Sequence, residues 1–335
     1  MRALVVTNMY PSAERPALGS FVRDQVHALQ RIDGLDVSVD AFSPGGARSY
    51  ARAARDLRRH HAGETYDIVH AHFGLTAWPA LTVAARHRVV TLHGNDLHDP
   101  RSRRITSAVL GRMDLVATPS ADFASDVPGA RSGRRRVAIL PCGIDVERFR
   151  PLDRRDARRR LDLDPDGRYL LFPYDPSRPV KRVERARELA ARSGTELLTL
   201  GSVEPADVPY WMNAANAVLC PSDWETFGLA CLEALACDVP VLARPVGAHR
   251  EALAGIAGAY CGEWDSERWL AALAPHLAAD DPRIEGRMRA LEFSADTMAA
   301  RVATAWRWLA SGGQPPPLYS PAEAPTEPSP GVSSS

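Results

Sequence analysis

Lysine is almost absent from this 335-residue sequence, since 40 of its 41 Lys and Arg residues are arginine. The single lysine, Lys181, lies in the segment DPSRPVKR (175–182). An ammonium group is a compact, strongly hydrated point charge that commonly binds phosphate. The use of lysine at this one position therefore favours a phosphate site, and the alternative is chance placement on a solvated loop.

Paired cysteines and long apolar runs are also missing. The five cysteines are odd in number, and no two of them have the spacing of a zinc or redox motif. No apolar run is long enough to cross a bilayer, and the segment MRALVVTNMYPSA (1–13) lacks the apolar core of a signal peptide. We therefore expect free thiols, a cytoplasmic location and, at most, peripheral contact with a membrane.

The net charge is zero but unevenly distributed. Residues 1–160 carry 26 arginines against 17 acids, whereas residues 161–335 carry 15 basic residues against 24 acids. Basic runs occur at RSRR (101–104), RSGRRR (131–136) and RRDARRR (154–160), and such runs are usually solvated faces. Our hypothesis is that the first two contact an anionic membrane or a lipid diphosphate. Aromatic residues are not interleaved with these runs, which argues against nucleic acid as a partner.

Short β-branched runs alternate with helical stretches in both halves of the chain. This alternation predicts an α/β fold with parallel sheets covered on both faces. Strands are expected at ALVVT (3–7), VSVDAFS (37–43), DIVHAHF (67–73), RVVTLHG (88–94), LVATPS (115–120), VAILPCG (137–143), RYLLFPY (168–174), ELLTLGS (196–202), AVLCPS (217–222), VPVLARP (239–245) and AGAYCG (257–262). Helices are expected over 19–32, 181–194, 227–238 and 293–313.

These elements predict two doubly wound, Rossmann-like domains that face each other across a cleft. We place the first domain at 1–145 and the second at 146–292. A last amphipathic helix over 293–311 is expected to pack back on the first domain. The remaining segment, 312–335, is rich in Pro and Ser and is expected to be a disordered tail.

The strongest local pattern is PSDWETFGLACLEALACD (221–238), where a loop glutamate precedes a helix that starts near Gly228. Backbone N–H groups at a helix start bind anions, and a glycine there lets a ligand approach closely. Glu233 shares an apolar helix face with Leu229, so its carboxylate needs a partner such as sugar hydroxyls or an arginine. Glu225 lies about 12 Å from Glu233 if both are helical, too far for a paired-carboxylate hydrolase site. The alternative is an ordinary buried helix with one satisfied glutamate.

The segment ETFGLACLE (225–233), with seven residues between two glutamates, resembles the motif of retaining GT-B glycosyltransferases, and most closely glycosyltransferase family 4. Further segments resemble family motifs and occur in the family's order. Before the two-glutamate segment these are TNMYPSAERPALGSFV, DIVHAHFG, TLHGND, ILPCGID and DPSRPVKR, and after it VGAHRE. The resemblance extends to about residue 311. It implies a GT-B fold whose N-terminal domain binds the acceptor and whose C-terminal domain binds a nucleotide-sugar.

The resemblance also implies roles for donor-site residues. Glu225 would lie beside hydroxyls of the donor sugar, and Glu233 would hold the ribose of the nucleotide. Backbone N–H groups facing the sugar and diphosphate would come from Phe227, Gly228 and Leu229. The base would be read near Gly201, in the loop 201–203.

Lys181 matches the family lysine that binds the donor diphosphate. Family members usually end the preceding strand with a Gly-Arg pair, but this chain has Phe172-Pro173 there. Arg178, three residues before Lys181, is our candidate for the missing guanidinium. Gly19 matches the N-terminal loop that approaches the leaving diphosphate.

On the acceptor side, His93 in HGND matches the family histidine near the reacting sugar, where an imidazole could orient a hydroxyl. For His70 and His72 a structural role is the favoured interpretation. Asp96 either contacts a substrate or caps a turn. We therefore predict His93, Lys181, Arg178 and Glu225 as the catalytic group.

The resulting expectation is an enzyme that transfers a sugar with retention from a UDP- or GDP-sugar to a cell-surface polysaccharide or glycolipid precursor. Its motifs are most similar to those of bacterial enzymes that make capsular or teichuronic-type polymers. No cofactor or metal is expected, because no Asp-x-Asp follows a strand at the appropriate place. Two alternatives are a nucleotide-sugar epimerase of the same fold and a non-enzymatic sugar-nucleotide-binding protein. A dinucleotide oxidoreductase is disfavoured, since VVTNMYPSA (5–13) lacks G-x-G-x-x-G.

Overall fold

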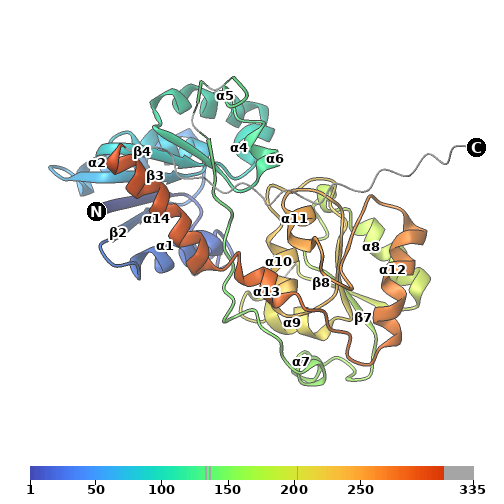
Figure 1. Ribbon diagram of the computed structural model, residues 1–335. Coiled ribbons are helices and arrows are strands. Elements are labelled where there is room, and N and C mark those ends of the chain that lie inside the picture. Colours follow the sequence, from blue (N-terminus) through green and yellow to red (C-terminus); the bar gives the residue numbers. More distant parts are fainter. Residues whose placement is uncertain (133, 136, 202, 313–335) are drawn as a thin grey trace, which may run out of the picture.

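The computed structural model describes residues 1–132, 134–135, 137–201 and 203–312. It contains two separate parallel sheets, each covered by helices, as Figure 1 shows. The first sheet has the strand order β2-β1-β3-β4-β5-β6, and the second has the order β11-β10-β9-β7-β8. The predicted α/β fold with two Rossmann-like sheets is confirmed. The predicted tail beyond residue 312, Ser202 and two positions of RSGRRR lie outside the described residues.

The N-terminal sheet is built from apolar strands whose two faces are both buried. Leu4 and Val6 pack against one layer of helices, while Ala3 and Val5 pack against the other. This two-sided burial explains why ALVVT is apolar throughout. The strands are β1 (Arg2–Thr7), β2 (Asp36–Ala41), β3 (Thr65–His72), β4 (Ala84–Thr91), β5 (Leu115–Thr118) and β6 (Val137–Ile139). The helices are α1 (Ser20–Gln30), α2 (Ala47–His60), η1 (Gly74–Thr76), α3 (Ala77–Ala80), α4 (Asn95–His98), α5 (Pro100–Val109), η2 (Leu110–Arg112) and α6 (Ala121–Ala124).

The strands of the C-terminal sheet are shorter than the sequence predicted, and the residues at several predicted strand ends belong to loops. The strands are β7 (Tyr169–Phe172), β8 (Glu196–Thr199), β9 (Ala217–Cys220), β10 (Val241–Ala243) and β11 (Tyr260–Cys261). The helices around them are α7 (Arg154–Arg160), η3 (Pro179–Lys181), α8 (Val183–Ser193), α9 (Val208–Ala214), α10 (Leu229–Ala236), α11 (His249–Leu253), α12 (Ser266–Ala278) and α13 (Arg287–Leu291). All five cysteines are free thiols.

One sequence expectation about the basic runs is wrong. The run RRDARRR forms α7, but Arg154 and Arg158 are buried rather than solvated. Nη2 of Arg154 donates to the carbonyl of Pro282 at 2.7 Å, and Nε of Arg158 donates to the carbonyl of Ala214 at 2.9 Å. These arginines satisfy buried carbonyl groups, which would otherwise be costly to desolvate.

The last helix, α14 (Ala295–Ser311), packs against α1 of the N-terminal domain, and its Trp306 joins the apolar cluster there. Ser294 caps its start by accepting from the N–H of Thr297. The chain thus crosses between the domains twice, and the two crossing segments pair: the N–H of Ile144 donates to the carbonyl of Phe293 at 2.9 Å. Within the described residues, no helix is long and apolar enough to span a bilayer.

Candidate active site

The strand order of the C-terminal sheet reverses direction between β7 and β9. The chain leaving β7 returns on one side as β8, and β9 pairs with β7 on the other side. In open α/β sheets, ligands bind beyond the carboxyl ends of the strands at such a topological switch point. Lys181 follows β7 and Glu225 follows β9, and the two side chains meet here, with Nζ 2.5 Å from Oε1.

The Lys181–Glu225 pair is nearly excluded from solvent, with side-chain exposures of 6% and 9%. The Ser222 hydroxyl donates to the same Oε1 at 2.9 Å, and the Tyr174 ring lies 4.2 Å from Nζ. Burial raises the pKa of Glu225, but Lys181, His249 and Ser222 outweigh burial, so the net pKa is lowered and Glu225 is ionised. The solvated-loop interpretation of Lys181 is therefore wrong.

The start of α10 lies next to this pair. Gly228 precedes the helix with φ of 103°, a conformation that glycine adopts without strain. A Cβ at Gly228 would lie 2.3 Å from Nε2 of His249. The first N–H groups of a helix lack intrahelical acceptors and are free to bind an anion. Phe227 is buried and Leu229 is half-buried at this helix start.

His249 contributes to the site although the sequence analysis did not select it. Its ring is fully buried, and its Nδ1 lies 2.9 Å from the carbonyl oxygen of Arg244. A carbonyl can only accept, so Nδ1 carries the proton and Nε2 has a lone pair, which has no partner within the described residues. The motif VGAHRE was the available signal, but it gave no indication that the ring reaches Gly228.

Glu233 lies on α10, eight residues after Glu225, and interacts electrostatically with Asp24 of the N-terminal domain. Burial raises the pKa of Glu233 to about 7, while Arg148 opposes the shift and Asp24 of α1 adds to it. Its carboxylate has no hydrogen bond within the described residues. The half-buried carboxylate of Glu233 therefore lacks a hydrogen-bond donor from the part of the protein that the structure describes. This agrees with the sequence analysis, which indicated that this carboxylate needs a partner.

On the N-terminal side, three histidines form a column at the ends of β3 and β4. His70 stacks on His72 at 4.7 Å between ring centroids, and His72 stacks on His93 at 5.3 Å. Nδ1 of His72 lies 3.1 Å from Nε2 of His93. Burial lowers the pKa of His72 to about 3 and that of His93 well below its usual value, with His72 adding to the effect on His93. The column is therefore uncharged at neutral pH.

Asp96 stabilises the loop that carries His93. It is fully buried, and its carboxylate accepts from the N–H groups of Gly74 and His93. Burial raises the pKa of Asp96 to about 6, although these N–H groups oppose the shift. Of the two roles considered for Asp96, the structure shows the turn-stabilising one.

The two domains touch through the loops that carry these residues. The hydroxyl of Thr226 donates to the carbonyl of His93 at 3.1 Å, and the hydroxyl of Ser120 donates to the carbonyl of Thr226 at 2.8 Å. The rings of His98 and Trp224 lie 4.0 Å apart. The loop before α10 therefore connects the histidine column of one domain to the Lys181–Glu225 pair of the other.

The remaining predicted residues are more peripheral. Gly19 caps α1 with φ of 67°, and a Cβ there would lie 2.2 Å from the carbonyl oxygen of Met9, so only glycine fits. Arg178 is exposed, and its guanidinium forms no ion pair or hydrogen bond within the described residues. Gly201 is exposed and lies near Pro176. The N–H of Lys181 donates to the carbonyl of Arg178 at 3.0 Å, but the Arg178 guanidinium itself is exposed.

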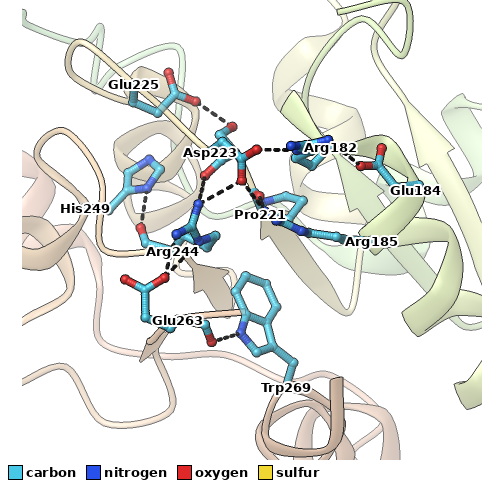
Figure 2. Close-up of polar contacts among 11 residues, drawn as sticks. Arg182, Glu184, Arg185, Pro221, Asp223, Glu225, Arg244, His249, Glu263 and Trp269 are labelled. Atoms are coloured by element: carbon cyan, nitrogen blue, oxygen red, sulfur yellow. Dashed lines mark hydrogen bonds and ion pairs between the residues drawn. The ribbon is translucent and has the colours of Figure 1, made fainter. Parts of the chain in front are cut away.

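Arginine side chains surround Asp223 instead, two residues before Glu225 in the chain (Figure 2). Asp223 pairs with Arg182, with Arg185 at 2.7 Å and with Arg244 at 2.9 Å. Within the described ranges, no group of three or more His, Cys, Asp or Glu side chains is arranged to hold a metal ion.

Comparison with known proteins identifies the family. The sequence profile of Glycosyltransferase Family 4 matches residues 5–148, and that of Glycosyl transferases group 1 matches residues 174–279. D-inositol 3-phosphate glycosyltransferase from Actinosynnema mirum is 30% identical over 297 residues, which cover 71% of this chain and 69% of the relative. The chain belongs to glycosyltransferase family 4. It is thus a nucleotide-sugar-dependent glycosyltransferase of a retaining family.

Other relatives and solved structures agree with this assignment. D-inositol 3-phosphate glycosyltransferase from Mycolicibacterium paratuberculosis is 28% identical, with 86% of this family 4 chain and 75% of the relative covered. Sucrose-phosphate synthase from Thermosynechococcus elongatus superposes with a TM-score of 0.76 at 17% identity, over 93% of this chain and 100% of that one. Anabaena HepE in complex with UDP and glucose superposes with a TM-score of 0.64 at 17% identity, over 90% and 98%. These structures establish the GT-B fold.

Proposed function

We propose that this family 4 enzyme transfers a hexose with retention from a UDP- or GDP-sugar to a polysaccharide or glycolipid precursor, without a metal ion. The observation that carries the proposal is the buried Lys181–Glu225 pair at the switch point, beside the start of α10. The C-terminal domain binds the donor, and the N-terminal domain binds the acceptor at the end of its sheet.

In this proposal, donor binding exchanges partners at the pair. The diphosphate takes the Lys181 ammonium, and hydroxyls of the donor sugar take the Glu225 carboxylate, so neither charge is left unpaired. As the leaving diphosphate gains negative charge, Lys181 and the N–H groups at Gly228 and Leu229 stabilise it electrostatically. Glu233 accepts from the ribose hydroxyls, which supply the donors that its carboxylate lacks.

His93 faces the transferred sugar as a neutral imidazole. Its lowered pKa means that it orients a hydroxyl through a hydrogen bond and contributes no charge. The contact of Thr226 with the carbonyl of His93 joins loops of the two domains, which supports a shared site for the reacting sugar. Closure at this contact excludes water, which would otherwise compete as the acceptor.

The donor class is tested by ligand-dependent thermal stability. Purified protein is heated with UDP-, GDP-, ADP- and dTDP-sugars, since a ligand at 100 times its Kd stabilises the folded state by about 2.7 kcal/mol. The solved complex of HepE with UDP-glucose favours the UDP class. Wild type should be stabilised by one class, and Glu233→Gln should lose most of that shift. If no nucleotide-sugar raises the melting temperature, the proposed donor site is wrong.

The acceptor is tested by transfer of labelled sugar. Several relatives are named for D-inositol 3-phosphate, which supports a small phosphorylated polyol as a second candidate acceptor. The assay compares inositol phosphate with lipid-diphosphate-linked glycans and determines the anomeric configuration of the product by NMR. Transfer to inositol phosphate alone would contradict the polysaccharide proposal, and inversion would contradict retention.

Peripheral contact with an anionic membrane, on the cytoplasmic side, is part of the proposal. Helices α2, α3 and α5 cover one face of the N-terminal sheet. Their exposed arginines form no ion pairs within the described residues: Arg48, Arg52, Arg55, Arg58 and Arg59 on α2, and Arg101, Arg103 and Arg104 on α5. Trp78 and Ile105 add exposed apolar surface, at 37% and 44%. A cationic face with apolar side chains complements anionic lipid.

Vesicle sedimentation tests this contact. Each arginine near an anionic surface contributes about 1 kcal/mol, so Arg103→Gln/Arg104→Gln should weaken binding roughly 30-fold. The matched control is Arg155→Gln/Arg159→Gln, which removes two exposed arginines from α7 in the other domain. Equal binding to neutral and anionic vesicles would overturn the proposal.

A further inference from the structure

The Asp223 network, formed by Asp223 with Arg182, Arg185 and Arg244, joins three segments beyond the carboxyl ends of the strands of the C-terminal sheet (Figure 2). Asp223 follows β9, Arg182 and Arg185 belong to the start of α8, and Arg244 follows β10. Charge-assisted hydrogen bonds of this kind are roughly twice as strong as neutral ones. The network therefore links the segments that follow β9 and β10 to the start of α8.

The arginines of this network are already neutralised, so the cluster does not form a vacant anion site. Arg244 also pairs with Glu263 at 2.5 Å, and Arg182 with Glu184 at 3.3 Å. Arg185 donates to the carbonyl of Pro221 at 2.8 Å. These contacts indicate a role in holding the site rather than in binding the donor.

Arg182 is the residue immediately after Lys181, and its backbone is unusual. Its φ of 58° is left-handed, a region that costs a non-glycine residue roughly 1–2 kcal/mol. The Asp223 carboxylate pairs with the Arg182 guanidinium and so stabilises this conformation. The left-handed residue ends the turn η3 and starts α8, which sets the direction in which Lys181 projects.

A main-chain contact completes the link. The N–H of Asp223 donates to the carbonyl of Val180 at 2.9 Å, directly before Lys181. One residue therefore holds the lysine turn through its backbone and through its side chain. Glu225 lies two positions later in the same loop. Asp223 therefore connects to both members of the Lys181–Glu225 pair: to Lys181 through the turn before it, and to Glu225 along the chain.

We propose that Asp223 is a positioning residue that holds Lys181 at the donor site through Arg182, Arg185 and the Val180 carbonyl. This inference rests on the proposed function, since the site that it positions is the donor diphosphate site. Asp223 itself touches neither the lysine ammonium nor the Glu225 carboxylate through any hydrogen bond of the described residues. Loss of its carboxylate should loosen the lysine turn while leaving Lys181, Glu225 and Gly228 chemically intact.

The single lysine of the chain provides a specific probe. Acetylation by an N-hydroxysuccinimide ester modifies Lys181 and the α-amine of Met1, and peptide mass spectrometry separates the two sites. Lys181 is 5% exposed in the folded protein, so its modification requires local opening. The rate at Lys181, divided by the rate at Met1, therefore measures how firmly the turn is held, with no donor present.

Asp223→Asn keeps the shape and the main-chain N–H but removes the negative charge. The ratio should rise roughly tenfold, which corresponds to opening that is easier by about 1.4 kcal/mol. Glu267→Gln is the matched control, because it cuts the Arg192–Glu267 pair at the far end of α8. That control should leave the ratio unchanged. Arg182→Gly, which permits the left-handed backbone but deletes the guanidinium, should raise the ratio as well.

An unchanged ratio in folded Asp223→Asn and Arg182→Gly would overturn the inference, as would an equal rise in Glu267→Gln. If Asp223→Asn does not fold, Arg182→Gly decides the question. Titration calorimetry with UDP then gives the functional consequence, an affinity at least roughly tenfold weaker in Asp223→Asn. Failure of wild type to bind UDP would contradict the UDP donor class, whereas the acetylation ratio would still test the positioning role.

Discussion

Lys181 and Glu225 come from opposite sides of the switch point, and Nζ of the lysine lies 2.5 Å from Oε1 of the glutamate. Ser222 donates to the same carboxylate oxygen. Two opposite charges are thereby kept out of water, each serving as the other's partner. A donor that offers a diphosphate to one and hydroxyls to the other separates them without leaving either charge unpaired, which is a demanding requirement for a ligand.

The pair predicts a large effect of a single substitution. Lys181→Met leaves the Glu225 carboxylate buried without its cation, so the free energy of unfolding should fall by about 3 kcal/mol. The double variant Lys181→Met/Glu225→Gln removes the stranded charge and should recover most of this loss. Urea denaturation of the single and double variants measures both values. Additive effects of the two substitutions would show that the pair is not coupled.

Glu233 predicts a pH dependence of stability. Burial raises its pKa from 4.5 to about 7. Between these two pH values the folded state therefore keeps a proton on Glu233 that the unfolded state has released. The stabilisation from the protonated form is complete below pH 4.5 and is lost as the pH rises through 7. Glu233→Gln cannot ionise, and at pH 8 it should be more stable than wild type by about 3 kcal/mol.

The measurement for Glu233 is the melting temperature of wild type and Glu233→Gln between pH 4.5 and 8. The two curves should meet near pH 4.5 and separate progressively towards pH 8. Curves that run parallel over the whole range would contradict the raised pKa. The same variant should bind UDP more weakly, because the proposed acceptor for the ribose hydroxyls has changed from a carboxylate to an amide.

The histidine column predicts that His93 stays neutral and depends on His72 for its orientation. The ring carbons of His72 and His93 should keep neutral-form NMR shifts from pH 5.5 to 8, because burial lowers the pKa of both. The amide of His72→Asn can donate or accept near the position of Nδ1, whereas His72→Phe keeps only the stacking.

Transfer rates distinguish these two variants. His72→Phe should lower kcat by 10-fold or more, roughly the value of one lost hydrogen bond, while His72→Asn retains most of the activity. Donor affinity should be similar in both variants, since His72 lies in the N-terminal domain, away from the proposed donor site. Equal activity of the two variants would remove His72 from any role in orienting His93.

Much of the fold could be predicted from local patterns. The continuous apolar run of residues 3–7 predicted a strand buried on both faces, and the helix expected over 293–311 corresponds to α14. The family was indicated by motifs in order, and the sequence profiles confirm it. Strand ends were less predictable: the run 137–143 is apolar throughout, yet only Val137–Ile139 pairs in the sheet.

The contacts within the candidate site could not be predicted, because the topology of the sheet creates them. Arg244 is more than twenty residues from Asp223, and nothing in the local sequence shows that β10 lies beside β9. Arg154 and Arg158 were expected to be solvated, because the carbonyl groups to which they donate belong to segments that are distant in the sequence. The expectation that Arg178 replaces the missing guanidinium came from proximity in sequence, whereas in space it is Arg182 that the site's loops hold.

Gly228 gives the last prediction, which separates backbone strain from contact. Gly228 and Gly255 both have positive φ, of 103° and 74°, so alanine at either position costs roughly 1–2 kcal/mol of backbone strain. A Cβ at Gly255 meets no atom within 4 Å, whereas one at Gly228 would lie 2.3 Å from Nε2 of His249. Gly228→Ala should therefore lower the free energy of unfolding by roughly 3 kcal/mol or more, because overpacking adds to the strain.

The functional consequence should differ even more than the stability. Displacing His249 or the start of α10 moves the N–H groups that are proposed to face the diphosphate, so Gly228→Ala should lose UDP binding while Gly255→Ala keeps it. Urea denaturation and calorimetry on the two variants give both comparisons. Adding His249→Ala to Gly228→Ala removes the clash, and recovered stability with restored UDP affinity would identify the imidazole contact as the cause. Equal losses in Gly228→Ala and Gly255→Ala would instead assign the whole effect to backbone conformation and leave His249 without a role at the donor site.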